Sequence, residues 1–177
     1  MANSKPKDPS TEDPAADSSD EWTKFDDLFR SAGRINNVDP TWLKAIALNE
    51  SDLGREASVA RGLEDPTDVD GSTSSDGKSW GLMQVTIPTG QQFDPNVTPE
   101  KLNNASYSVN LSARLVSWLK DQFSDSDPRF LQWVIKSYNQ GRGNTNKERK
   151  GQIEGYAQAY WDRFQRNLKT VQDKGGL

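Results

Sequence analysis

The chain has 177 residues and a formal net charge of −4, and it contains neither cysteine nor histidine. This length suits one domain with a hydrophobic core of its own. The missing residue types exclude disulfides, thiolate nucleophiles, Ser-His-Asp catalysis and histidine-ligated zinc. Any acid–base chemistry must therefore fall to carboxylates, tyrosines or lysines.

Residues 1–20 are rich in proline, serine and aspartate and hold two lysines against five acidic residues. They lack the apolar stretch of a secretory signal peptide. We expect a disordered acidic tail here, because the segment has few apolar side chains to offset the entropy of ordering it. The remainder, residues 21–177, is expected to form one folded domain.

Two helices are predicted at the start of this domain. Asp20 is expected to cap a first helix that ends at Gly33. Asp39-Pro40 places a capping side chain before a proline at the first helical position, and the second helix should run to about Ser51. The apolar residues of the first helix lie on one face, which is made of Trp22, Phe25, Phe29 and Ala32.

Later helices follow the same signals. Thr98-Pro99 and Asp127-Pro128 repeat the capping pair, and a last helix is expected from Ile153 to about Thr170. The apolar positions of these helices are Val109, Leu111, Leu115, Trp118 and Leu119, then Phe130, Leu131, Val134, Ile135 and Tyr138, then Tyr156, Tyr160, Trp161 and Phe164. The sequence therefore predicts a predominantly all-α fold with at most a small β-hairpin near residues 68–86.

Residues 54–80 have no helical or strand period and are expected to form a polar surface loop that lines a cleft. The aspartates between residues 64 and 77 suggest a calcium-binding loop. However, aligning Gly71 with the glycine of a calcium loop puts Pro66 and Gly77 at ligand positions, so that pattern fails. We expect neither a metal nor a cofactor.

Glu50 lies at the end of an apolar helix, so burial should raise the pKa of its carboxyl. Such a group holds a proton near neutral pH and can donate it to the leaving oxygen of a glycoside. The alternative is a surface charge near a helix C-terminus, where a negative group is mildly unfavourable. Glu50 is the candidate catalytic residue.

Two later motifs supply a binding cleft. Gly81 allows close backbone approach to a sugar ring, Met83 offers an adaptable apolar contact, and Gln84 can donate and accept hydrogen bonds. Tyr138 and Asn139 end a buried helix before a sharp turn at residues 140–143, where they could grip an N-acetyl group or orient the glutamate.

These motifs, in this order, resemble the soluble lytic transglycosylase family over about residues 38–166. That family shares a lysozyme-like α-helical fold with goose-type lysozymes. The resemblance rests on Glu50-Ser51, residues 81–85 with Pro88, residues 102–119 centred on Asn110, Tyr138-Asn139 with Gly141, and Tyr156.

The resemblance implies cleavage of the MurNAc–GlcNAc β-1,4 bond of peptidoglycan glycan strands. Glu50 would act first as acid on the glycosidic oxygen and then as base on the C6 hydroxyl, which gives a 1,6-anhydro product. It also implies that Ser51, Gln84, Tyr138, Asn139 and Tyr156 orient Glu50 or hold the sugar.

Three departures from the family pattern stand out. Ser137 replaces the usual alanine, Gln140 replaces a small residue, and the segment between Glu50 and Gly81 is longer than usual. The long segment keeps a goose-type hydrolase open as an alternative, with Asp70 or Asp76 positioning a water. Thr86 stands where those lysozymes usually have an aspartate.

Other classes are a catalytically inactive virion or peptidoglycan-binding module and a nucleic-acid binder. The last would rest on the segment from Arg129 onward, which has ten basic and four acidic residues. We expect neither a nucleic-acid nor a membrane partner, since no apolar run could span a bilayer. Without a signal peptide, the sequence suggests a bacteriophage enzyme. It would be carried in the virion, with other virion proteins as partners, or be released at lysis to act on the bacterial cell wall.

Overall fold

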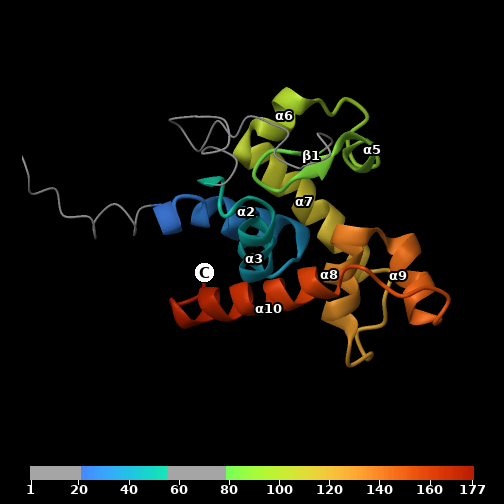
Figure 1. The fold of residues 1–177 in the computed structure, drawn as a ribbon. Coiled ribbons are helices and arrows are strands. Elements are labelled where there is room, and N and C mark those ends of the chain that lie inside the picture. The colour runs from blue at the N-terminus through green and yellow to red at the C-terminus, as the bar shows by residue number, and fades with distance from the viewer. Residues whose placement is uncertain (1–20, 56–78) are drawn as a thin grey trace, which may run out of the picture.

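The computed structural model describes residues 21–55 and 79–177, so the expected acidic tail and most of the polar loop lie outside the described residues. Two short antiparallel strands, β1 (Ser79–Trp80) and β2 (Val85–Thr86), form the hairpin, and Trp80 is paired with Val85. The helices are α2 (Asp26–Asn36), α3 (Pro40–Ser51), α5 (Ile87–Gly90), α6 (Pro99–Asn103), α7 (Ala105–Lys120), α8 (Phe130–Gln140), α9 (Arg142–Arg149) and α10 (Gln158–Asp173). The prediction of a mainly α-helical domain with a small hairpin is confirmed (Figure 1).

Helix α3 lies at the centre of the helical assembly. It packs most extensively against α10 and also contacts α2 and α7, while α8 packs against α7, α9 and α10 (Figure 1). The side chains of Leu43, Ala45, Ile46 and Ala47 have no exposed surface. A helix that is apolar on most sides is expected to be central. None of the described helices is long and apolar enough to cross a membrane.

Of the four predicted helix caps, those at Asp39 and Thr98 are confirmed, the one at Asp127 is wrong, and Asp20 lies outside the described residues. Asp39 accepts a hydrogen bond from the amide of Thr41 at 2.8 Å, and Thr98 caps α6 in the same way. Helix α8 begins only at Phe130, with Arg129 at its N-cap position. The carboxylate of Asp127 instead bonds the amide of Arg129 and the indole of Trp133, which stabilises the turn before the helix.

The predicted stop at Gly33 is also wrong. Helix α2 continues to Asn36 and ends at Asn37, whose φ of 54° suits a left-handed cap. A Cβ atom on Gly33 would lie 2.6 Å from the carbonyl oxygen of Val38. Glycine is therefore required because the chain returns closely over the helix, and not because the helix ends there.

The C-terminal region differs from the prediction in two ways. Helix α10 begins at Gln158 and not at Ile153, so Tyr156 precedes the helix. Helix α9 was not predicted. It follows directly after Gly141, whose φ is 79°, and Thr145 is its single buried residue. A helix with so little apolar surface carries no periodic signal in the sequence.

Candidate active site

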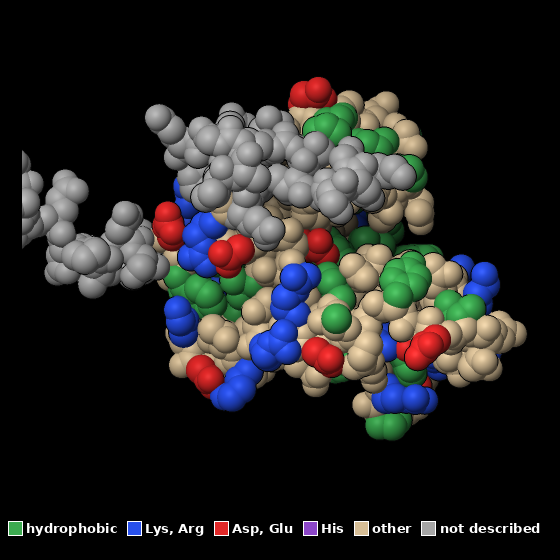
Figure 2. Space-filling view, in the orientation of Figure 1, with side chains coloured by type: hydrophobic (Ala, Val, Ile, Leu, Met, Phe, Trp, Pro, Cys, Tyr) green, Lys and Arg blue, Asp and Glu red, His purple; other side chains and the backbone are tan. Residues whose placement is uncertain are grey.

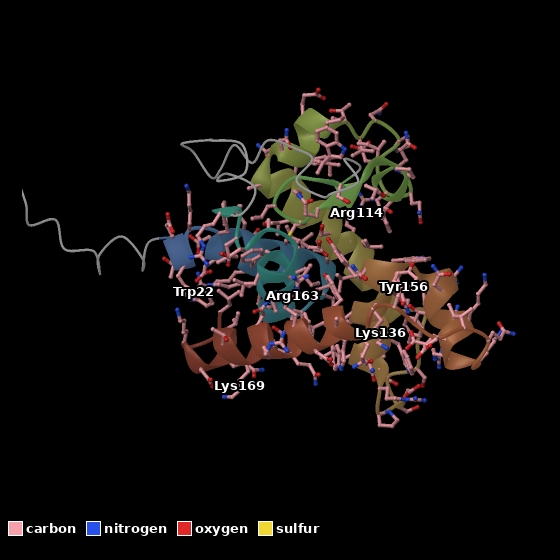
Figure 3. The ribbon with its side chains drawn as sticks, in the orientation of Figure 1. Trp22, Arg114, Lys136, Tyr156, Arg163 and Lys169 are labelled. Carbon is pink, nitrogen blue, oxygen red and sulfur yellow. The ribbon has the colours of Figure 1, made fainter. Side chains whose placement is uncertain are left out.

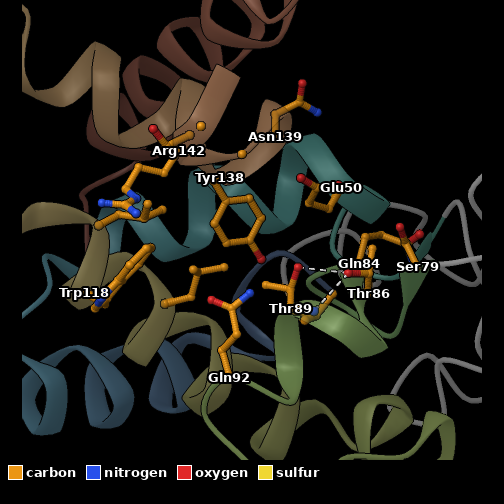
Figure 4. A pocket seen from close by; sticks show the side chains of 16 residues that line it. Glu50, Ser79, Gln84, Thr86, Thr89, Gln92, Trp118, Tyr138, Asn139 and Arg142 are labelled. Carbon is orange, nitrogen blue, oxygen red and sulfur yellow. Dashed lines mark hydrogen bonds between the residues drawn. The ribbon is translucent and has the colours of Figure 1, made fainter. Parts of the chain in front are cut away.

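A cavity of about 410 Å³ lies among the hairpin, α3, α5, α7 and the junction of α8 with α9. The surface is hollowed between the part that carries α5 and α6 and the part that carries α8 and α9 (Figure 2). The lining residues are Glu50, Ser79, Gln84, Val85, Thr86, Thr89, Gln92, Leu115, Trp118, Leu119, Ser137, Tyr138, Asn139, Gly141, Arg142 and Gly143 (Figure 4). Within this lining, Glu50 is the one acidic residue and Arg142 the one basic residue.

Glu50 is the penultimate residue of α3 and is half-buried at the cavity wall. Its carboxylate oxygen Oε1 accepts a hydrogen bond of 2.6 Å from the hydroxyl of Tyr160. Burial raises the pKa of Glu50 from its ordinary value of 4.5 to about 7, against the opposing effects of the Tyr160 hydrogen bond and the charge of Arg163. The carboxyl therefore holds a proton near neutral pH and faces a cavity.

Tyr160 was not predicted as a site residue, since the sequence placed it in the apolar face of the last helix. Its ring is buried in the core, and its hydroxyl meets Glu50. Burial, and next the negative charge of Glu50, raise the pKa of Tyr160 well above its usual value, so the hydroxyl remains a donor. A buried tyrosine hydroxyl almost always needs a partner, and that need was the one signal available in the sequence.

Asn49 fixes the other end of Tyr160. Its amide donates to the carbonyl of Tyr160 at 3.1 Å and accepts a 2.7 Å hydrogen bond from Asn167 of α10. Consecutive residues of α3 thus hold the backbone and the hydroxyl of the same tyrosine. Arg163 projects from α10 one turn later, with its guanidinium 5.9 Å from the Tyr160 ring centre (Figure 3).

Ser51, a predicted site residue, does not line the cavity. It is buried, and its hydroxyl donates to the carbonyl of Leu82 at 2.7 Å and accepts from the amide of Gly54. These bonds tie the end of α3 to the turn of the hairpin. Ser51 therefore sets the position of Glu50 relative to the motif at residues 81–84.

Gly81 and Met83 also lie behind the cavity wall. Gly81 has a φ of 73°, and a Cβ atom there would lie 1.8 Å from the carbonyl oxygen of Leu102. The close approach that the glycine permits is thus to the protein's own backbone. The side chain of Met83 has no exposed surface. Its carbonyl accepts a 2.8 Å hydrogen bond from the hydroxyl of Tyr138.

Gln84, Tyr138 and Asn139 are the predicted binding residues that do line the cavity together with Glu50. The side-chain amide of Gln84 donates to the carbonyl of Gly81 at 2.8 Å. The Tyr138 hydroxyl also lies 3.0 Å from Ser112, so it connects α7, α8 and the hairpin. Asn139 is exposed at the opening beside Glu50 (Figure 4).

Tyr156 is not among the lining residues. It is 65% exposed, and its hydroxyl contacts the carbonyl of Gln140 and the amide of Asn144. Figure 3 shows it beside α9. The buried side chain of Gln140 also stabilises the segment around Tyr156. It accepts a hydrogen bond from the backbone amide of Ala157 and donates one to the carboxylate of Glu148.

The cavity also contains residues that were not predicted: Ser79, Thr86, Thr89, Gln92, Trp118 and Arg142. Thr86 caps α5, and its hydroxyl lies 2.9 Å from that of Thr89. Asp70 and Asp76, which the hydrolase alternative needs, lie outside the described residues. Among residues 21–55 and 79–177, no group of three or more acidic side chains could hold a metal ion.

Comparison with known proteins identifies one family. A family model described as the transglycosylase SLT domain matches residues 27–160, which include Glu50, the hairpin motif, Tyr138 and Tyr160. No curated protein matches the chain.

Proposed function

The chain belongs to the transglycosylase SLT domain family, and on that premise we propose that it cleaves the MurNAc–GlcNAc β-1,4 bond with Glu50 as its single acid and base. The family acts on peptidoglycan by lytic transglycosylase-type cleavage. One observation carries the assignment of Glu50: it is the one carboxylate among the described residues of the cavity, and the pKa of its carboxyl is raised to about 7.

In the first step, the protonated carboxyl of Glu50 gives its proton to the glycosidic oxygen. The bond between C1 of MurNAc and that oxygen breaks, and positive charge develops at C1. Tyr160 donates to Oε1 of Glu50, so the proton for transfer belongs on Oε2. The Tyr160 hydrogen bond also stabilises the carboxylate that proton transfer creates.

In the second step, the carboxylate of Glu50 takes the proton of the C6 hydroxyl of the same MurNAc residue. The C6 oxygen then bonds C1, which closes the 1,6-anhydro ring. Glu50 ends the cycle protonated, and no water is consumed. A carboxyl whose pKa lies near the working pH suits both proton transfers.

Supporting residues fall into two groups in this proposal. Gln84 and Asn139 face the cavity and would hydrogen-bond the N-acetyl or hydroxyl groups of the sugars. Ser51, Met83 and Tyr138 would hold the hairpin turn against α3 and α8 through the bonds described above, and Gly81 would let the turn approach Leu102 of α6. Tyr160, rather than Tyr156, would position the catalytic carboxylate.

Hydrolysis by a goose-type mechanism needs a group that positions a water molecule. The described lining offers no second carboxylate. Thr86, which stands where goose-type lysozymes usually have an aspartate, instead uses its hydroxyl to cap α5. Asp70 and Asp76, the other candidates for that group, lie outside residues 21–55 and 79–177, so analysis of the products decides between the two routes.

Turbidity loss of purified cell walls tests the proposed activity. The wild type should clear the walls, and Glu50→Gln should not. Glu154→Gln is a matched control, because Glu154 is exposed and outside the cavity. If the wild type and Glu50→Gln clear walls equally, Glu50 is not the acid. If neither clears them, the result favours the binding-module alternative. Delivery in a phage particle remains a prediction that immunoblotting of purified particles would test.

A further inference from the structure

Arg142 brings to the proposed substrate cavity a positive charge that has no ion-pair partner among the described residues. It is the first residue of α9, directly after the turn at Gly141, and it lines the cavity with its neighbours Gly141 and Gly143. In Figure 4, Arg142 and Trp118 lie on one side of Tyr138, and Glu50 lies on the other. The two charged groups of the lining thus occupy different ends of the cavity.

Two described neighbours contact the guanidinium of Arg142, and neither of them carries a negative charge. It lies 5.3 Å from the ring centre of Trp118, and it donates to the amide oxygen of Gln122 at 2.9 Å. Nearby cations do have carboxylate partners: Lys136 pairs with Glu148 at 2.5 Å, and Arg149 pairs with Asp127 at 3.4 Å. Arg142 forms no ion pair with any described residue.

A guanidinium presents five N–H donors in a planar fork that matches a carboxylate. One of these donors is used by Gln122, and stacking on Trp118 limits the freedom of the side chain before a ligand arrives. Ser137 lines the same cavity with a buried hydroxyl that has no partner among the described residues. The guanidinium of Arg142 therefore keeps donors that the described residues do not use.

Resting on the proposed function, we propose that Arg142 and Trp118 form a subsite for a carboxylate carried on the lactyl side of MurNAc. Such a carboxylate belongs either to the peptide stem or, in strands without stems, to the lactyl group itself. Arg142 would then be a specificity residue, which favours muramyl strands over neutral polysaccharides and takes no part in bond cleavage.

The test compares steady-state cleavage of three strand preparations. The first carries intact stems, the second carries the same stems with their carboxyls amidated, and the third has been stripped of stems so that the lactyl carboxylates are free. Products are quantified chromatographically for the wild type, Arg142→Gln and Arg142→Lys. Arg166→Gln is the matched control, since Arg166 is exposed on α10, outside the cavity, and loses the same charge.

We expect Arg142→Gln to raise KM about tenfold on strands that carry the recognised carboxylate, with kcat little changed, because one charge-assisted contact is lost. On amidated strands Arg142→Gln should match the wild type, which also shows that the variant is folded. Arg142→Lys should recover part of the loss, and Arg166→Gln should match the wild type throughout. A KM penalty on stripped strands assigns the lactyl carboxylate, and a penalty confined to stem-bearing strands assigns the stem.

Two outcomes overturn the subsite. One is an Arg142→Gln variant with wild-type KM on both carboxylate-bearing strands. The other is an equal KM penalty on amidated strands, because that would indicate a packing role beside Trp118. A wild-type chain that cleaves none of the preparations would instead defeat the proposed function itself, and the subsite with it.

Discussion

The hydroxyl of Tyr160 donates a 2.6 Å hydrogen bond to the carboxylate of Glu50, across 110 residues of sequence. The adjacent Asn49 holds the carbonyl of the same tyrosine, so α3 and α10 are joined at the acid itself. This arrangement combines a buried carboxyl with one fixed donor, and both should affect kcat, its pH dependence and the stability of the fold.

Replacing Tyr160 with phenylalanine should lower kcat about tenfold and leave KM nearly unchanged. The variant loses the hydrogen bond to the Glu50 carboxylate that forms during the reaction. Without that bond the carboxylate can rotate out of its position. The control is Tyr156→Phe, because the Tyr156 hydroxyl contacts only Gln140 and Asn144 among the described residues. A larger loss of kcat in Tyr156→Phe than in Tyr160→Phe would contradict this positioning role.

The pH profile of kcat/KM should fall above about pH 7. Glu50 must be protonated to act as the acid, and burial raises the pKa of its carboxyl to about 7. Activity should drop roughly tenfold per pH unit beyond that point. The measurement uses wall fragments in buffers of constant ionic strength. A falling limb near pH 4.5 would show that Glu50 is not desolvated as described.

Arg163→Gln should move that falling limb to higher pH. The positive charge of Arg163 lowers the pKa of Glu50, so its removal favours the protonated carboxyl. Arg166→Gln, which removes the same charge from an exposed position on α10, should leave the limb in place. Identical shifts in the two variants would mean that only net charge matters.

Glu50→Gln should be more stable than the wild type above neutral pH. Folding raises the pKa of Glu50. The favourable contribution of this carboxyl to the free energy of unfolding is therefore present below pH 4.5 and is lost as pH rises through about 7. The advantage of the glutamine variant should therefore grow by about 2–3 kcal/mol between pH 5 and pH 8. Urea unfolding of both proteins at the two pH values measures it, and a constant difference would refute a buried, titrating Glu50.

The sequence predicted the helical architecture because its signals are local. The cap at Asp39 and the apolar residues of α3 place Glu50 near a helix end without reference to the rest of the chain. The same signals failed at Gly33, where the reason for glycine is the return of the chain at Val38, a contact that no local pattern reveals.

The site was predicted less completely, because its parts meet through long-range contacts. Tyr160 and Tyr156 are both aromatic residues near the start of α10, and only the helix start at Gln158 and the packing on α3 bring Tyr160 to Glu50. Gly81 and Met83 were expected to touch sugar, yet they support the cavity wall from behind. Arg142 has no apolar period around it, so nothing in the sequence marked its position beside Trp118.

Mass spectrometry of peptidoglycan digested in ¹⁸O-labelled water measures the proposed chemistry most directly, because the intramolecular step consumes no solvent. Wild-type products should end in 1,6-anhydro-MurNAc, with no added water and no ¹⁸O, and Glu50→Gln should release none of them. Products that carry one ¹⁸O-labelled water per cut would contradict an anhydro-forming mechanism with Glu50 as its single acid and base.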